Sequence, residues 1–265
     1  LCALLVAGVL ARVVRSNNSR ARAEQARQCA IRARDFFGYV HATLWYANAT
    51  DTLHAEEVLA AIRRSREEMS ALGAPHAYVA WLSGVEADGH LLRGDPRACR
   101  ERLRVALGAF PGRRADTDTR LTAALLACWQ GRPEEAAAHL GRAEELSAEQ
   151  SGFLVSTFDA VRAELAVAAG DAPAAVAAAR TGLLQDNTPT LIERLVPLAA
   201  RALADEIRRR RDRAADPQAA VADLERLRAQ YPAVVIEPGA GVLRRRTERA
   251  MQALYDAEYA RGRGD

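Results

Sequence analysis

The sequence predicts an all-α protein, an α-solenoid of antiparallel helical hairpins. One short motif, a glycine followed within two or three residues by Asp or Pro, recurs at nearly constant spacing. Its copies begin at Gly94, Gly131 and Gly170, so the intervals are 37 and 39 residues. The segments between the copies carry apolar residues at helical spacing. A turn that recurs at this period between helix-length segments is typical of stacked helical hairpins.

The chemistry of each turn predicts where one helix ends and the next begins. Glycine adopts the left-handed backbone conformation at a helix C-terminus at little cost. The aspartates Asp95 and Asp171, which follow two of the glycines, are favourable N-caps, and proline fits the first turn of a helix. We therefore expect each glycine to end the first helix of a hairpin and the next residues to begin the second.

Small residues stand in register around the three turns, and we expect them to be positions of close helix packing. They lie seven residues before, five after and twelve after each turn glycine: Ala87, Ala124 and Ala163; Cys99, Ala136 and Ala175; Ala106, Ala143 and Gly182. A fourth position, between the second and the third of these, accepts a larger side chain and holds Leu103, Leu140 and Ala179. The pattern resembles the tetratricopeptide repeat, which forms a right-handed superhelix. That repeat is usually about 34 residues long and richer in aromatic residues than this chain, which has 5%.

Apolar periodicity and capping residues define the remaining elements in order. Helices are predicted at residues 1–15, 20–34, 36–50, 56–72, 76–93, 96–110, 118–130, 133–146, 151–169, 173–184, 190–214, 218–231 and 240–262. The equivalent turn positions are 16, 53, 94, 131, 170 and 215. Pro197 is expected to bend its helix, and residues 231–239, with a proline near each end, are expected to form an extended loop.

The whole chain, residues 1–265, is predicted to form a single solenoid domain. It has no break in composition that would mark a second domain. The sequence does not begin with Met, and its last predicted helix has no polar capping repeat after it. We therefore expect it to be a fragment of a longer chain.

Composition and charge favour a bacterial cytoplasmic protein. Every basic side chain is Arg, and the net charge is only +3. With abundant Ala and Gly, this indicates a GC-rich genome more simply than a nucleic-acid partner. The apolar residues 1–10 are too few to span a bilayer and lack a cleavage site, so we expect a buried helix and no membrane contact. The four cysteines show no paired spacing, and we expect buried free thiols.

No catalytic, cofactor-binding or metal-binding site is predicted, and we expect the protein not to be an enzyme. The chain contains no GxxxxGKS/T, GxSxG or HExxH motif. None of its histidines has a second histidine or a cysteine three or four residues away; they are His41, His54, His76, His90 and His139. Acid pairs such as Glu134 and Glu135 stand in first helical turns, where they complement the helix dipole.

Two arginine runs, residues 208–211 and 244–246, are the most basic segments. Consecutive helical residues point in different directions around the helix, and no aromatic residue alternates with them. A nucleic-acid interface needs both features, so the favoured interpretation is a solvated helix end. Phosphate contact and an ion network with another subunit are the alternatives.

Several phrases give the chain a more specific resemblance. They are GVEAD at 84–88, LLRGD at 91–95, LTAALLA at 121–127, AAHLGRAEEL at 137–146, ELA at 164–166 and LAARALA at 198–204. They are similar to the helical region of large ATP-binding bacterial transcriptional regulators of the LuxR type, over residues 35–265. In that family an ATPase domain precedes this region and a helix-turn-helix follows it. The resemblance implies a sensor or arm segment, with the ATP-binding and DNA-binding sites outside this segment.

The favoured function is therefore a protein-interaction or effector-sensing module of such a regulator, acting in signal transduction and transcription regulation. Its expected partners are a protein, peptide or small effector and other domains of the same regulator, without sequence-specific DNA contact. The alternative is a free-standing tetratricopeptide-like scaffold or adaptor. An all-helical enzyme is the third hypothesis. A Walker motif upstream and a helix-turn-helix downstream would distinguish the first from the second.

A ligand is expected on the concave surface, which the first helix of each hairpin lines in such repeats. The inward positions, counted from the turn glycines, are Trp81, Asp88 and Leu92; Leu121, Leu125 and Trp129; Glu164 and Val167. Two indole rings beside two carboxylates predict an apolar groove suited to a cationic peptide or small amphipathic ligand. The alternative is that Trp81 and Trp129 fill gaps that the many alanines leave.

Overall fold

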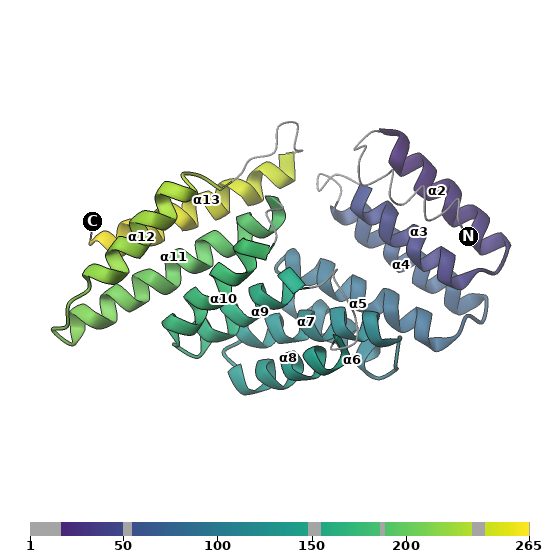
Figure 1. Ribbon diagram of the computed structural model, residues 1–265. Helices are drawn as coiled ribbons and strands as arrows, with labels where there is room; N and C mark the ends of the chain where they lie inside the picture. Colours follow the sequence, from purple (N-terminus) through teal and green to yellow (C-terminus); the bar gives the residue numbers. More distant parts are fainter. Residues whose placement is uncertain (1–16, 50–54, 148–154, 186–188, 235–241, 265) are drawn as a thin grey trace. The chain divides into compact units, whose positions relative to one another are not determined.

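The structure, a computed structural model, describes residues 17–49, 55–147, 155–185, 189–234 and 242–264. Within these ranges all the regular secondary structure is helical, as predicted (Figure 1). The helices are α2 (Asn17–Arg32), α3 (Phe36–Ala49), α4 (Ala55–Ala71), α5 (His76–Leu92), α6 (Pro96–Leu107), α7 (Arg113–Trp129), α8 (Pro133–Ser147), α9 (Val155–Ala168), α10 (Ala172–Gln185), α11 (Pro189–Asp212), α12 (Gln218–Gln230) and α13 (Val242–Arg263). The helix predicted for residues 1–15 and turn positions 16 and 53 lie outside the described residues.

Six of the described helices end in the same hydrogen-bonded turn. At Gly131, for example, the backbone N–H donates to the Cys128 carbonyl at 3.1 Å, and the Arg132 N–H donates to the Ala127 carbonyl at 2.9 Å. This is the Schellman arrangement, which satisfies the last carbonyls of a helix and requires one residue with positive φ. The residues with positive φ in these turns are Arg34, Gly73, Gly94, Gly131, Gly170 and Ala214.

The three turns that define the predicted repeat are confirmed. Gly94, Gly131 and Gly170 have φ values of 74°, 67° and 72°. The carboxylates of Asp95 and Asp171 then accept the backbone N–H three residues later, at 3.0 and 3.1 Å. Each of these hairpins therefore has a glycine stop, and two of them have an aspartate start for the second helix.

The last predicted turn, at position 215, lies one residue earlier in the structure. Ala214 has the positive φ, 51°. The Ala215 N–H donates to the Arg210 carbonyl at 2.8 Å, so Ala215 occupies the place after the left-handed residue. Because no glycine marks this turn in the sequence, its predicted position differs from the observed one by one residue. The left-handed conformation costs a non-glycine residue roughly 1–2 kcal/mol.

Helix α7 begins five residues earlier than predicted, at Arg113 instead of 118. Gly112 has a φ of 93°, and its carbonyl accepts the Asp116 N–H at 2.9 Å, so the helix starts directly after the glycine. The charged residues at 113–116 conceal the helical pattern in the sequence. Ala115 and Asp116 are nevertheless buried, so this first turn is part of the packed structure.

All of the predicted small packing positions are buried, which confirms the register. The alanines and the cysteine among them are 0–1% exposed. At Gly182, a Cβ atom would lie 2.7 Å from Leu195 Cδ1, so α10 and α11 approach too closely for a side chain there. The larger positions Leu103, Leu140 and Ala179 are buried as well.

The chain divides into two compact units, which meet in sequence within α7 between Thr122 and Ala123. In unit 1, α2 packs on α3, α4 packs on α3 and α5, and α5 packs on α6. Helix α3 also contacts α5, so the first helices of consecutive hairpins touch. The core between them contains Ala30, Ile31, Tyr39, Val40, Met69, Trp81, Leu82 and Ala115.

A buried arginine joins the first three described helices of unit 1. The guanidinium of Arg27 on α2 lies 5.5 and 5.4 Å from the ring centroids of Tyr39 and Tyr46 on α3. It also donates to the Ser65 hydroxyl of α4 at 2.7 Å. Stacking on aromatic faces is favourable for this weakly hydrated cation. Arg27 thus connects α2, α3 and α4.

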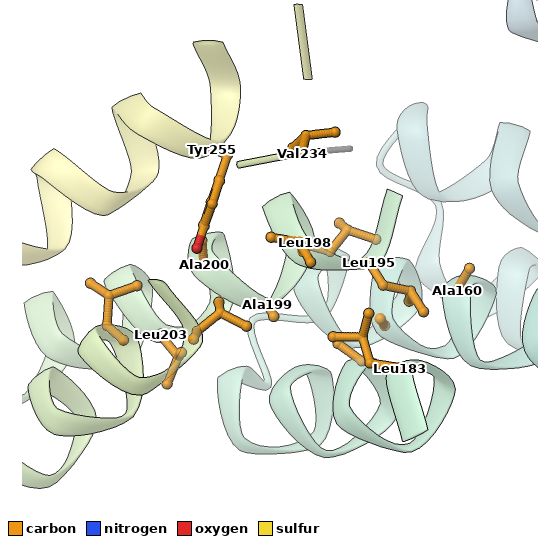
Figure 2. Close-up of a cluster of buried hydrophobic side chains, with 14 of the residues drawn as sticks. Ala160, Leu183, Leu195, Leu198, Ala199, Ala200, Leu203, Val234 and Tyr255 are labelled. Carbon is orange, nitrogen blue, oxygen red and sulfur yellow. The ribbon is translucent and has the colours of Figure 1, made fainter. Parts of the chain in front are cut away.

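In unit 2, α9 packs on α8, α10 and α11, while α11 packs on α10, α12 and α13. Figure 2 shows the main core, where Leu195 and Leu198 of α11 lie near Leu183 of α10 and Tyr255 of α13. The fully buried Tyr255 donates its hydroxyl to the Tyr231 carbonyl at 3.0 Å. Helix α11 continues through Pro197. The all-α helical-hairpin fold is thereby confirmed, and one solenoid over the whole chain stays a prediction.

Replacing Ala136 with Leu is expected to lower the free energy of unfolding by about 1–3 kcal/mol, because the position is fully buried. The matched control is Ala138→Leu on the same helix, where the side chain is exposed and the change should stay within about 0.5 kcal/mol. Denaturant titration followed by circular dichroism measures both. Equal losses in the two variants would contradict the packing register.

Ala214→Gly is expected to raise the free energy of unfolding by about 0.5–1 kcal/mol, because relief of the left-handed strain outweighs the added freedom of the unfolded chain. Gly131→Ala should lower it by about 1 kcal/mol. A Cβ at Gly131 would meet no atom within 4 Å, so that loss would be purely conformational. Thermal unfolding of the two variants tests this, and shifts of the same sign would refute it.

Candidate ligand-binding faces

The first helices of unit 1 bring aromatic and acidic side chains from three successive hairpins together. Helix α3 contacts α5. Gly84 of α5 lies so close to α7 that a Cβ there would overlap the Thr119 hydroxyl. A continuous series of ring and electrostatic interactions joins these three helices. We call this surface the unit 1 face; it comprises Phe37, His41, Trp81, Asp88, Arg114 and Asp118.

Three aromatic rings form one end of the unit 1 face. Phe37 and His41 are one turn apart on α3, with ring centroids 4.4 Å apart. The Trp81 ring of α5 lies 5.2 Å from His41, edge to face, and 6.3 Å from Phe37. Trp81 is only 8% exposed, whereas Phe37 is 50% exposed. The indole therefore supports a phenyl ring whose outer half meets solvent, and such ring contacts fix its position.

The imidazole of His41 is neutral at neutral pH. Partial burial lowers its pKa, and the positive charge of Arg114 on α7 lowers it further. Asp35, at the start of α3, acts in the opposite direction but does not cancel these effects. The three rings of the aromatic end are therefore uncharged under ordinary conditions, although Arg114 and Asp35 lie near them.

Two aspartates form the other end of the unit 1 face. Asp88 of α5 and Asp118 of α7 are both exposed. The hydroxyl of Thr122 donates to an Asp88 carboxylate oxygen at 3.4 Å and to the Asp118 backbone carbonyl at 3.2 Å. Asp88 is seven residues after Trp81 on the same helix, and Asp118 is four residues after Arg114. Seven residues of helix extend about 10 Å, so the acidic end lies two turns from the aromatic end.

The Asp118 carboxyl has a pKa raised to about 6. The largest cause is desolvation: the side chain reaches water, but many protein atoms surround it. The nearby Arg114 lowers the pKa and the negative charge of Asp88 raises it again, so the raising effects prevail. An aspartate in this setting keeps its charge near neutral pH at an energetic cost.

Other carboxylates near the face are engaged in packing. Glu86 of α5 is buried and accepts the Arg66 guanidinium of α4 at 3.0 Å, with His90 3.8 Å away. Asp116 of α7 is buried and pairs with Arg120 at 3.1 Å. The Arg66–Glu86 pair joins α4 to α5, whereas the Asp116–Arg120 pair lies within α7. Asp88 and Asp118 are the exposed carboxylates of the unit 1 face.

Of the residues predicted to contact a ligand in unit 1, some are buried and others are exposed. Trp81 and Leu121 are buried, so they offer a ligand little surface, whereas Asp88 is exposed and Leu92 is 72% exposed. Phe37, His41 and Asp118 were not among the predicted residues. A signal for the first two exists in the sequence: they are spaced by four on α3, a helix without Asp, Glu, Lys or Arg. Asp118 was missed because α7 was expected to begin there.

The predicted contact residues of unit 2 are less closely grouped. Leu125 is buried, Trp129 is 51% exposed at the end of α7, and Glu164 and Val167 of α9 are half-buried. Val167 lines a shallow hollow of about 470 Å³ between the end of α9 and α11. The other lining residues are Ala168, Ala169, Gly170, Asp205, Arg208, Arg209 and Asp212.

The arginine run at 208–211 lies at the solvent-exposed end of α11, and three of its side chains also contact other parts of unit 2. Arg209 donates to the Gly170 carbonyl in the α9–α10 turn. Arg210 donates to the Asp216 carbonyl at 3.3 Å, and Arg211 donates to the Arg263 carbonyl of α13 at 3.2 Å. The consecutive arginines point in different directions around the helix, as predicted. Arg209, Arg210 and Arg211 each contact a different part of the chain. The side chains of residues 244–246 lie outside the described part of the chain.

The described residues contain no group of three or more His, Cys, Asp and Glu side chains that would suit a metal ion. No helix among them is both long and apolar enough to cross a membrane.

Of the cysteines, Cys99 and Cys128 are buried as expected, and burial raises their pKa values to about 12 and about 11. Cys29 is exposed, contrary to expectation. Both buried thiols are therefore unreactive at neutral pH.

The hairpins, their Schellman turns and the registered small residues define a repeat of antiparallel helical hairpins. No family model matches the chain, and no curated protein sequence does either. A solved structure that resembles it is the TPR2AB-domain:pHSP90-complex of yeast Sti1. The two are 12% identical over 92% of this chain and 100% of that chain, with a TM-score of 0.35. At this level of similarity, the assignment of the fold rests on the hairpins of this chain.

Asp118→Asn is expected to stabilise the protein at pH 7, because it removes a charge that the folded state disfavours. The raised folded pKa means that the folded state holds the Asp118 proton more tightly than the unfolded chain does. The contribution of Asp118 to the free energy of unfolding of the wild-type protein is therefore fully present below about pH 4 and is lost as the pH rises through about 6. Denaturant titrations of both proteins at several pH values should show a difference that grows across this range. A difference independent of pH would contradict the assignment.

Proposed function

We propose that the protein is a ligand-binding module, not an enzyme, and that the unit 1 face holds a segment of a protein, a peptide or a small effector. The observation that supports this most directly is the half-exposed Phe37 ring, held against His41 and Trp81. A large aromatic side chain in a fixed position can bury much area on a partner at a small entropic cost. The buried Trp81 keeps that position fixed, so the ring is ready for contact before any ligand arrives.

The polar groups of the unit 1 face support binding by a specific partner. An apolar contact alone selects poorly between ligands, whereas a few placed polar groups fix orientation. Asp88, Arg114 and Asp118 supply such groups two turns or less from the rings. Leu92, at the end of α5 and largely exposed, adds apolar area on the same helix as Trp81 and Asp88.

Within unit 2, we propose Trp129, Glu164 and Val167 as a second set of contacts. Trp129 offers half of its indole to solvent, and Val167 lines the hollow beside α11. A half-exposed indole is a common anchor for a partner. Leu125 is buried one turn before Trp129 on α7.

For the biological setting, we propose the sensor or arm region of a bacterial LuxR-type transcriptional regulator, located in the cytoplasm. The support is the similarity of residues 35–265 to that region. The ATPase and DNA-binding domains would lie outside this segment and would be among its partners in signal transduction. Sequence-specific DNA contact by this segment is not expected, because Arg209, Arg210 and Arg211 donate to backbone carbonyls of other parts of unit 2. The alternative proposal is a free-standing tetratricopeptide-like scaffold.

The setting can be tested in the coding sequence on either side of this segment. A Walker motif upstream and a helix-turn-helix downstream would support the regulator. Continuous reading frames without either motif would favour the scaffold.

The binding role predicts different results for two exposed phenylalanines. Phe37→Ser should weaken any peptide or effector found by fluorescence screening of the whole chain at least tenfold, since the variant loses the central aromatic contact. Phe110→Ser is the matched control, because Phe110 is 61% exposed in unit 1 but is not part of the face. Fluorescence polarisation gives both affinities. Equal affinities in the two variants would remove the unit 1 face as the binding site.

A further inference from the structure

The charge distribution of the unit 1 face restricts the chemistry of its ligand. Helix α3 contributes no Asp, Glu, Lys or Arg, and Glu86 and Asp116 are buried in ion pairs. The charged residues of the unit 1 face are therefore Asp88 and Asp118, both exposed, and Arg114, which lies one turn before Asp118. The two carboxylates come from different helices and lie close enough for the charge of one to act on the other.

We propose that the ligand of the unit 1 face is a cationic segment, one that places an arginine or lysine side chain beside Asp118 and Asp88 and an apolar side chain on Phe37. The inference rests on the proposed binding function and adds the chemical class of the partner. A basic group can contact two exposed carboxylates at once, and the guanidinium of arginine suits paired carboxylate oxygens best. The side chain next to it then meets the phenyl ring.

The spacing of the two ends gives the register of such a segment. Asp88 lies seven residues, about 10 Å, beyond Trp81 along α5. Three residues of an extended chain cover the same distance, as do two turns of a helix. A basic residue and an apolar residue three apart in an extended segment, or seven apart in a helical one, would reach both ends of the face.

The electrostatics agree with a cation and disfavour an anion. The ionised Asp118 is destabilised by desolvation and by Asp88, and Arg114 offsets this only in part. An added positive charge relieves this cost, so part of the binding energy comes from the strain already present. An anionic ligand would meet both carboxylates with only Arg114 to receive it. At the aromatic end His41 is neutral, and the charges of Arg114 and Asp35 near it are opposite in sign.

Protonation should weaken this binding in acid. Below about pH 6 Asp118 loses its charge. His41, which faces Arg114 and Asp35, also gains a positive charge in acid, at a lower pH than an ordinary histidine because its pKa is lowered. Both changes act against a cationic ligand. The affinity is therefore expected to fall between about pH 7.5 and pH 5, while Asp118→Asn should lose the part of this change that belongs to Asp118.

The experiment uses the whole chain and two labelled peptide probes of identical apolar sequence, with leucine and a charged residue alternating at three-residue spacing. One probe carries arginine and the other glutamate. Fluorescence polarisation should show tighter binding of the arginine probe. Asp118→Asn should weaken it about two- to fivefold, the range for one exposed ion pair, and Asp88→Asn with Asp118→Asn should weaken it further. Glu101→Gln, an exposed carboxylate on α6, is the matched control and should leave the affinity unchanged.

The outcomes separate this inference from the proposed function. If both probes bind equally and Phe37→Ser abolishes both, the face is a binding site without charge preference, and the cationic class is overturned alone. If Glu101→Gln weakens the arginine probe as much as Asp118→Asn does, the attraction is general and the inference fails. If neither probe binds, or if Phe37→Ser leaves arginine-probe binding intact, both proposals are overturned.

Discussion

The close approach of helices at small residues is the constraint on which this structure depends. The distance between packed helices follows from the side chains at their contact. At Gly182 and Gly262 the neighbouring leucines, Leu195 and Leu224, occupy the space in which a Cβ would lie. The same condition holds at the fully buried alanines, which recur once per hairpin. Each hairpin can stack on the next only because these positions stay small.

A core of small residues gains less from burial than one of Leu and Phe, since the hydrophobic contribution follows the apolar area removed from water. Polar contacts between elements add to it in this protein. Arg27 lies between two tyrosine rings and reaches α4. Arg209 and Arg211 donate to carbonyls at the ends of other helices. Arginine suits this use because its long apolar stem packs along a helix while its planar end reaches several acceptors.

Features that depend on local sequence could be predicted, and features that depend on distant contacts could not. The turns at Gly94, Gly131 and Gly170 follow from the conformational freedom of glycine, and the buried alanines follow from their spacing around those turns. Ala214 takes the left-handed conformation because the surrounding helices hold it there, and nothing in its own chemistry signals this. The contacts of Trp81 with His41 and Phe37 join α5 to α3, two helices apart in the chain. Sequence spacing places Trp81 on the correct helix, but only the packing shows that its ring is covered and that Phe37 is the exposed one.

The unit 1 face bears two features that work against stability, and their coincidence is the strongest physical reason to regard it as functional. A half-exposed phenylalanine leaves apolar area in water, and an aspartate with a raised pKa keeps a charge in a place that disfavours it. Either feature alone is common in proteins that bind nothing. Here both lie on the first helices of successive hairpins. A bound partner that covers the ring and neutralises the carboxylates would offset both at once, which is the relation expected of a site kept for binding.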